Sequence, residues 1–244
     1  MAETTFFSGE GDGEARYTTE SDWDTAHDTG TGTEKADQGV KSDQGAQAEL
    51  FSGAYYITRI FYPFDTSAID SGDVVSAATL SFYESRGMVQ NDDTIDAVLV
   101  ETTQPDHTVL ATSDYGKCGS IFTPDEIGEI ALSAISTNAY NAITIDDLTA
   151  IKVSGAASTC GTALTGWSCI GMRNSRDVDD SAPSGGNYFG TYFSEQTGTG
   201  NDPKLVVTHA AVTNIKSVNG LAVASIKSVN GLAIASTKSI NGLE

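Results

Sequence analysis

The sequence predicts an all-β protein, a jelly-roll β-sandwich followed by a short C-terminal β-repeat tail. Short runs of β-branched and aromatic residues recur between clusters of Gly, Asp, Ser and Asn, a pattern typical of sandwiches and barrels. Strand patterns do not alternate with helix patterns, which disfavours α/β folds. The chain also ends in an 11-residue repeat. Its 244 residues are enough for one β domain with a sizeable core.

Residues 1–50 are the least regular part of the predicted sandwich, because they are poor in Leu, Ile and Val and rich in Gly, Asp, Glu and Thr. We expect an irregular β-edge with long loops that packs onto the strands that follow. The alternative is a disordered segment, although aromatic residues are unusual in such segments. The aromatic residues spaced like anchors of short strands are Phe6, Phe7, Tyr17 and Trp23.

The strand patterns become stronger after residue 50. Residues 54–64 are aromatic and β-branched throughout, which suits a strand. In residues 74–83 apolar and polar side chains alternate, which predicts a strand with one buried face. Residues 147–153 are the only stretch that suggests a helical turn. Further short strands are expected at residues 96–101, 115–122, 128–133, 142–145, 167–173, 187–194 and 203–209. The predicted sandwich domain covers residues 1–210.

Residues 211–244 form the predicted tail, in which near-identical 11-residue copies are followed by a truncated third copy. An 11-residue period can mark a right-handed helical supercoil, but a Gly in each copy disfavours a helix. Each copy instead contains Asn-Gly between apolar residues, the strongest short signal for a β-hairpin. We therefore expect Val218 to face Leu221 across the first turn. The later copies repeat this arrangement with the pairs Val229/Leu232 and Ile240/Leu243.

Hairpins with such short strands cannot bury a core alone, so the tail needs a partner. It could pack on its own domain, wind with copies from other subunits, or add strands to the open sheet edge of another protein. We expect intermolecular assembly, in which apolar side chains are buried and lysines contact acidic surface. The predicted assembly residues are Ile215, Lys216, Val218, Leu221, Ile226, Lys227, Val229, Leu232, Lys238, Ile240 and Leu243.

The charge of the chain excludes several classes of partner. It has 33 acidic and 13 basic residues, a formal net charge of −20. Nucleic-acid binding and polybasic membrane binding both need Lys and Arg, so neither is expected. Apolar runs are too short for membrane insertion. The tail differs in having Lys216, Lys227 and Lys238 against one acid, Glu244. The acidity indicates a solvated surface, with salt adaptation or calcium sites as alternatives.

Catalytic motifs are missing: the sequence has no Gly-x-Ser-x-Gly elbow, phosphate-binding loop or His-Glu-x-x-His. We therefore expect a non-enzymatic protein without a cofactor, apart from a structural calcium ion. Calcium binds six to eight oxygen ligands, and the best local acidic clusters supply Asp12, Asp177, Asp179 and Asp180. A zinc site is not expected, because His27, His107 and His209 show no zinc-ligand spacing with the cysteines.

Two further groups of residues have alternative interpretations. An exposed aromatic platform would suit sugar stacking, whereas core packing is the alternative role. The candidates for glycan binding are Trp23, Trp167, Tyr188 and Tyr192. Cys160 and Cys169 bracket a short loop that a disulfide could close in an oxidising compartment. The alternative is that the three cysteines, Cys118 included, are small buried hydrophobic residues.

Several stretches resemble the DNRLRE-type jelly-roll domains, although the literal DNRLRE string is absent. Residues 59–69 and 75–83 resemble the core signature of that family, as do 190–196 and 202–208. Residues 170–177 resemble its penultimate strand and loop. The resemblance implies a β-sandwich similar to carbohydrate-binding modules, found on secreted, surface and phage-encoded proteins. Coupled to repeats of this type, such a domain looks like the structural proteins of phages and environmental genomes.

We therefore expect a non-enzymatic structural protein of a virion, as capsid decoration, fibre or tail, or a filament subunit. Its partners would be copies of itself or other virion or filament proteins. The first residues show no secretory signal, which fits a virion protein assembled in a host cytoplasm. The expected location is a virion or an extracellular assembly. The alternative is a carbohydrate-binding module or surface adhesin that binds glycan.

Overall fold

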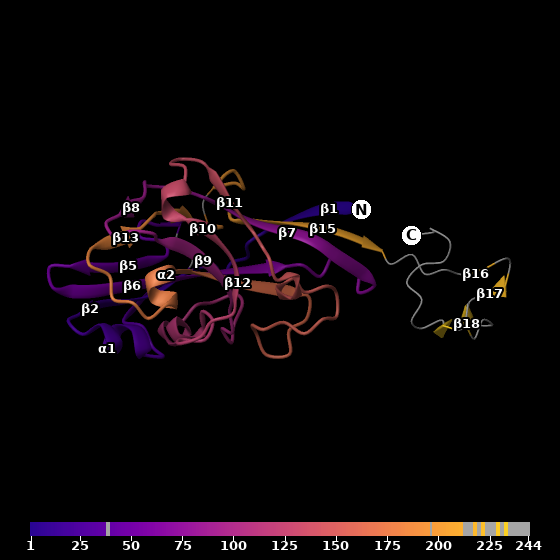
Figure 1. Ribbon diagram of the computed structural model, residues 1–244, viewed down its shortest axis with the longest axis horizontal. Helices are drawn as coiled ribbons and strands as arrows, with labels where there is room; N and C mark the ends of the chain where they lie inside the picture. The colour runs from indigo at the N-terminus through magenta and orange to yellow at the C-terminus, as the bar shows by residue number, and fades with distance from the viewer. Residues whose placement is uncertain are drawn as a thin grey trace. The chain divides into compact units, whose positions relative to one another are not determined.

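The computed structural model describes residues 1–37, 40–195 and 197–211, together with four two-residue strands of the tail. The chain divides into two compact units, Met1–Ala210 and Ala211–Glu244, here named the body and the tail. The body consists of antiparallel sheets and short helical segments (Figure 1). The predicted all-β fold class and β-sandwich are therefore confirmed. Among the described residues, no helix is long and apolar enough to cross a membrane.

The smaller sheet of the body contains, in spatial order, β1 (Ala2–Phe7), β15 (Lys204–Ala211), β7 (Asp73–Tyr83) and β11 (Tyr140–Thr144). β1 pairs antiparallel with β15, and β11 pairs antiparallel with β7. Leu205 and Val207 are buried in β15, as are Leu80 and Phe82 in β7. Because alternate residues of a strand share a face, these side chains direct one face of the sheet into the core.

The larger sheet is built around β6 (Ala54–Asp65), which pairs with β12 (Trp167–Asn174), β5 (Gln47–Phe51) and β2 (Gly13–Glu20). β12 pairs along residues 60–65 of β6, and β5 along residues 54–58. The other described strands of this sheet are β3 (Glu34–Asp37), β8 (Val89–Gln90), β9 (Asp96–Glu101), β10 (Glu126–Ala131) and β13 (Gly186–Tyr188). A separate short ladder joins β4 (Lys41–Ser42) to β14 (Thr191–Tyr192).

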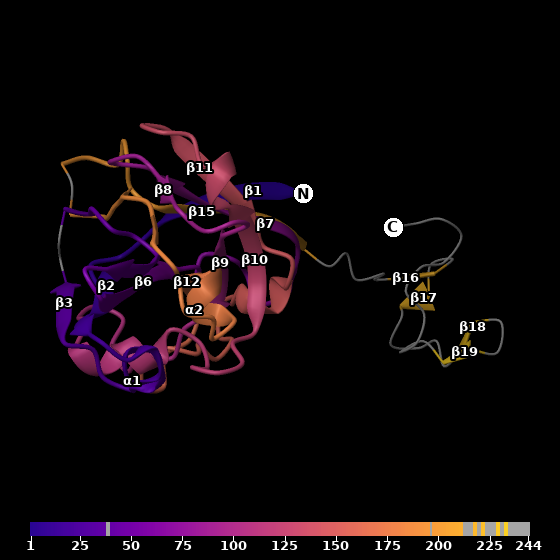
Figure 2. The same cartoon turned by 60° about the vertical axis from the view of Figure 1, so that its left-hand side comes forward.

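Apolar side chains pack on both faces of β6. Ile60, Tyr62 and Phe64 belong to the core between the two sheets. Ile57 and Phe61 belong to a second core on the opposite face, where α1 (Trp23–Asp28) and the 3₁₀ helix η1 (Thr112–Lys117) contribute side chains. Figure 2 shows α1 at the edge of the body beside β2. A strand buried on both faces needs apolar residues at successive positions, which accounts for the apolar run at residues 60–64.

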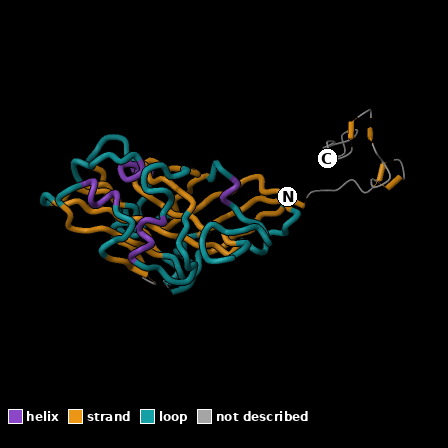
Figure 3. Tube along the Cα trace, turned by 90° about the horizontal axis from the view of Figure 1, so that it is seen from below, coloured by secondary structure: helices purple, strands orange, loops and turns teal. Residues whose placement is uncertain are grey.

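The structure corrects several sequence-based boundaries. Trp23 begins α1 rather than anchoring a strand, because Asp22 caps that helix by accepting a hydrogen bond from the Asp24 amide. Residues 115–122 are not a strand, since η1 occupies the first part of that stretch. Residues 1–50 do not form only an edge, since β2 lies between β3 and β6. Short helical segments also occur at η2 (Leu132–Ala134), η3 (Leu148–Ala150) and α2 (Ser175–Val178) (Figure 3).

The cysteines divide into one pair and one free thiol. A disulfide joins Cys160 to Cys169, closing the predicted short loop. Cys118 is free and buried in the second core. Burial raises the pKa of the Cys118 thiol to about 12, which keeps it protonated and unreactive at neutral pH.

Candidate functional sites

A fully buried ion-pair network ties the second core together. Asp177 accepts hydrogen bonds from Arg59 Nε and Nη2, at 2.9 and 2.6 Å, and from Arg173 Nε at 2.6 Å. Arg59 also donates to the backbone carbonyls of Tyr115 and His27. Burial alone would raise the pKa of Asp177, but the two guanidinium groups outweigh it and hold that pKa well below its usual range. The network connects α1, η1 and α2 to β6 and β12.

This network contradicts the prediction that Asp177 binds calcium. Both of its carboxylate oxygens already accept hydrogen bonds from arginines, and two adjacent positive charges disfavour a cation. Asp12 is also buried, and it accepts hydrogen bonds from Ser8 and Ser194. Burial raises the pKa of Asp12 well above its usual value. Asp179 is exposed, and Asp180 accepts a hydrogen bond of 2.9 Å from the Trp23 indole. Asp12, Asp177 and Asp180 therefore accept hydrogen bonds from different donors.

The aromatic residues predicted to bind glycan do not form one platform. Trp23 is buried in the second core, so the prediction that it stacks on a sugar is wrong and core packing is its role. Trp167 is half-buried, with its ring centroid 4.3 Å from that of His107. Tyr192 is half-buried against Tyr83, at a centroid distance of 5.9 Å.

Tyr188 lines an aromatic groove of about 320 Å³ on the body, together with Phe51, Tyr56, Gln44 and Glu49. Phe51 is 61% exposed and is the last residue of β5. It pairs with the first residue of β6, and the two turn residues between them have positive φ, as in a tight hairpin. Burial raises the pKa of Glu49. The groove thus combines aromatic rings with a carboxylate and an amide.

Sequence reasoning identified Tyr188 but missed the other aromatic members of this groove. The signal was present, because the run at residues 54–64 is aromatic and follows a Ser-Gly turn. That pattern predicts a strand but does not show which of its residues are exposed. The first residues of the run are half-buried at the hairpin end of β6, so Tyr56 reaches the groove. Arg86 lies over the Tyr188 ring, 5.7 Å from its centroid.

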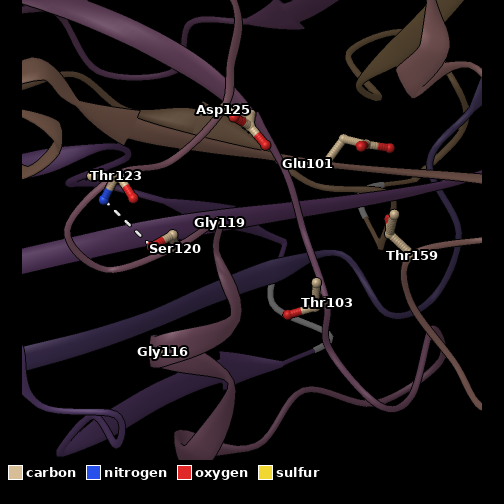
Figure 4. Close-up of a pocket in the computed structure, with 8 residues that line it drawn as sticks. All are labelled: Glu101, Thr103, Gly116, Gly119, Ser120, Thr123, Asp125 and Thr159. Atoms are coloured by element: carbon tan, nitrogen blue, oxygen red, sulfur yellow. Dashed lines mark hydrogen bonds between the residues drawn. The ribbon is translucent and has the colours of Figure 1, made fainter.

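A second pocket, of about 480 Å³, has a polar lining (Figure 4). Its side chains include the carboxylates Glu101 and Asp125 and the hydroxyl groups of Thr103 and Ser120. Glu101 forms an ion pair of 2.8 Å with Lys152, so one of the pocket's two carboxylates is already neutralised. The lining also contains Gly116, Gly119, Thr123 and Thr159. The pocket offers hydrogen bonds to a polar ligand, and its described lining lacks an aromatic ring for stacking or a histidine for proton transfer.

The described residues of the tail form two hairpins with the predicted register. β16 (Ser217–Val218) pairs with β17 (Leu221–Ala222), so Val218 lies opposite Leu221. β18 (Ser228–Val229) pairs with β19 (Leu232–Ala233), so Val229 lies opposite Leu232. These pairings confirm the expected position of the turn in both copies. The other predicted assembly residues lie outside the described residues: Ile215, Lys216, Ile226, Lys227, Lys238, Ile240 and Leu243.

A scan against models of known protein families finds no match, and no curated protein matches the sequence. The resemblance to the DNRLRE-type domains therefore stays a prediction.

Proposed function

We propose that this protein is a non-enzymatic structural subunit that assembles through residues 211–244. It would serve as a capsid decoration protein, a fibre protein or a protein of the virion's own tail, or as a filament subunit. The observation that carries the proposal is the shared register of two consecutive hairpins. Each described ladder has only two residue pairs, and isolated hairpins of this kind are marginal in water. Near-identical units repeated along the chain suit repeated binding to identical partners, which are copies of this chain or other assembly proteins.

The charges and the disulfide agree with this proposal. A body with most of the 33 acidic residues repels other copies, so the contacts that hold an assembly must overcome that repulsion. The tail has more lysines than acids and suits contact with acidic surface. The bond between Cys160 and Cys169 suits an oxidising environment, such as the exterior of a virion or an extracellular filament.

We expect charge substitutions in the tail hairpins to weaken assembly. A variant with Leu221→Asp and Leu232→Asp removes two apolar side chains, each worth about 1.5–3 kcal/mol when buried. The concentration at which the assembly dissociates should therefore rise at least about tenfold, measured by analytical ultracentrifugation. The control variant, Ser217→Asp with Ser228→Asp, adds the same charge to the paired strands without removing apolar groups. Equal dissociation of both variants would show that the two leucines do not hold the assembly together through apolar contacts.

Glycan binding is a second candidate function, supported by the aromatic groove. A sugar ring can stack on an exposed aromatic face while its hydroxyl groups form hydrogen bonds with Gln44 and Glu49. Such a groove would let an assembled array attach to a glycan surface with many weak contacts at once.

The groove predicts a specific loss of glycan binding on substitution. Phe51→Ala should weaken the binding of a glycan identified on an array by about tenfold, equivalent to about 1.4 kcal/mol. Phe122→Ala is the matched control, since Phe122 is 58% exposed against 61% for Phe51 and does not line the groove. A wild-type protein that binds no glycan, or equal losses in the two variants measured by calorimetry, would contradict this function.

A further inference from the structure

His27, Asp28 and Asp180 bring a nitrogen and two carboxylates together beside the second core. His27 is fully buried at the end of α1, and its Nδ1 lies 2.6 Å from Asp28 Oδ1 and 3.3 Å from Asp180 Oδ1. The potential ligand atoms of the three residues all lie within 4.8 Å of one another. The two carboxylate groups are partly exposed, at 42% and 46%, so the cluster is open to solvent on one side.

The other ring nitrogen fixes the orientation of the His27 imidazole. Its Nε2 lies 2.8 Å from the backbone carbonyl oxygen of Asp177, which only accepts hydrogen bonds, so Nε2 carries a hydrogen. In the neutral ring Nδ1 then has a lone pair that faces two carboxylate oxygens. The Nδ1 lone pair and the two carboxylate oxygens are all acceptors, so a positive charge is needed between them. Either a second proton on the ring or a metal ion can supply it.

Neighbouring groups hold the cluster in place. The Trp23 indole donates to Asp180 Oδ1, and the Trp23 ring stacks on His27 at a centroid distance of 5.5 Å and an interplanar angle of 21°. Arg173 Nη2 donates to the same Asp177 carbonyl oxygen at 2.7 Å, which anchors the acceptor of the His27 hydrogen bond. A histidine ligand in metal sites commonly donates its second N–H to a carbonyl or carboxylate in this way.

We propose that His27, Asp28 and Asp180 bind a divalent transition-metal ion of the zinc class. Zinc binds imidazole nitrogen and carboxylate oxygen in four-coordinate sites, and three protein ligands leave one position for water. Calcium and magnesium prefer oxygen ligands alone, so the imidazole disfavours them. The ion links α1 to the loop after α2. This site differs from the sequence-based expectation that zinc is absent, which considered only local spacing. His27 and Asp28 are adjacent in the sequence, whereas Asp180 comes from a distant part of the chain.

The test uses the full-length chain without an affinity tag, stripped with a chelator and titrated with zinc chloride by calorimetry. One zinc ion should bind per chain at this site, and zinc should raise the thermal midpoint, whereas calcium and magnesium should have much weaker effects. Asp28→Asn and Asp180→Asn should each lower the zinc affinity at least about tenfold, because each removes a charged ligand with little change in shape. Asp24→Asn, an exposed substitution in the same helix, should leave it unchanged.

Three results would overturn the proposal. The first is a wild-type chain without a zinc-dependent change in heat or thermal midpoint. The second is zinc binding of equal strength in wild type, Asp28→Asn and Asp180→Asn, which places the ion elsewhere. The third is an NMR spectrum in which both His27 ring nitrogens remain protonated in excess zinc, which shows that a proton supplies the positive charge. None of these outcomes bears on assembly through the tail.

Discussion

Asp177→Ala is expected to destabilise the body by about 3–5 kcal/mol, because it leaves two buried guanidinium groups without a counter-charge. Arg59 and Arg173 are both fully buried, and they contact Asp177 at 2.6 Å. Since a domain typically has only about 5–15 kcal/mol of stability, this loss is a large part of the total. Urea denaturation of the body, followed by far-UV circular dichroism, measures the change.

The control for this variant is Asp179→Ala, which removes an exposed carboxylate two residues away. It should change the free energy of unfolding by less than about 0.5 kcal/mol, as surface substitutions usually do. A loss of similar size in both variants would show that the buried network contributes no more to the free energy of unfolding than an exposed carboxylate does. An Asp177→Ala protein as stable as wild type would contradict the role of the network directly.

The pH dependence of stability follows from the same network. Asp177 has a lower pKa in the folded state than in the unfolded chain, so its contribution is complete above the unfolded value of about 3.9. That contribution is lost only as the pH falls below about 4 toward the folded value. Asp12 has the opposite shift: its folded pKa is raised by burial, so lowering the pH through that value favours the folded state. The body should therefore keep its fold in mild acid.

The features predicted well from the sequence were those with local signals. The Asn-Gly dipeptide fixes where a two-residue hairpin turns, so the pairing of Val218 with Leu221 could be derived from neighbouring residues alone. The run at residues 54–64 identified the central strand β6 because β-branched and aromatic side chains suit a pleated surface.

The missed features depend on residues far apart in the chain. Arg59 and Asp177 are separated by 118 residues, and the sequence gives no spacing that joins them. A single arginine within an apolar strand was nevertheless a signal, because a buried guanidinium requires a buried carboxylate. α1 was missed because it has only 6 residues, and so short a helix depends on the Asp22 cap and on the packing of Trp23.

Removal of the tail is expected to abolish assembly while the body stays folded. The body has its own hydrophobic cores, and all of their members among the described residues lie before position 211. A chain of residues 1–210 should therefore unfold with the same urea midpoint as the full-length protein. Its mass in solution should be that of one body, because it lacks the repeated hairpins that we propose supply the contacts between copies.

The central claim is that the repeats hold the assembly together, and the molar mass in solution tests it most directly. Light scattering coupled to size exclusion should give a multiple of the 25.5 kDa chain for the full-length protein and a single body for residues 1–210. Because the acidic bodies repel one another, the full-length assembly should persist at low protein concentration only when the tail is present. An unchanged assembly after removal of residues 211–244, or a monomeric full-length protein at all concentrations, would contradict the account.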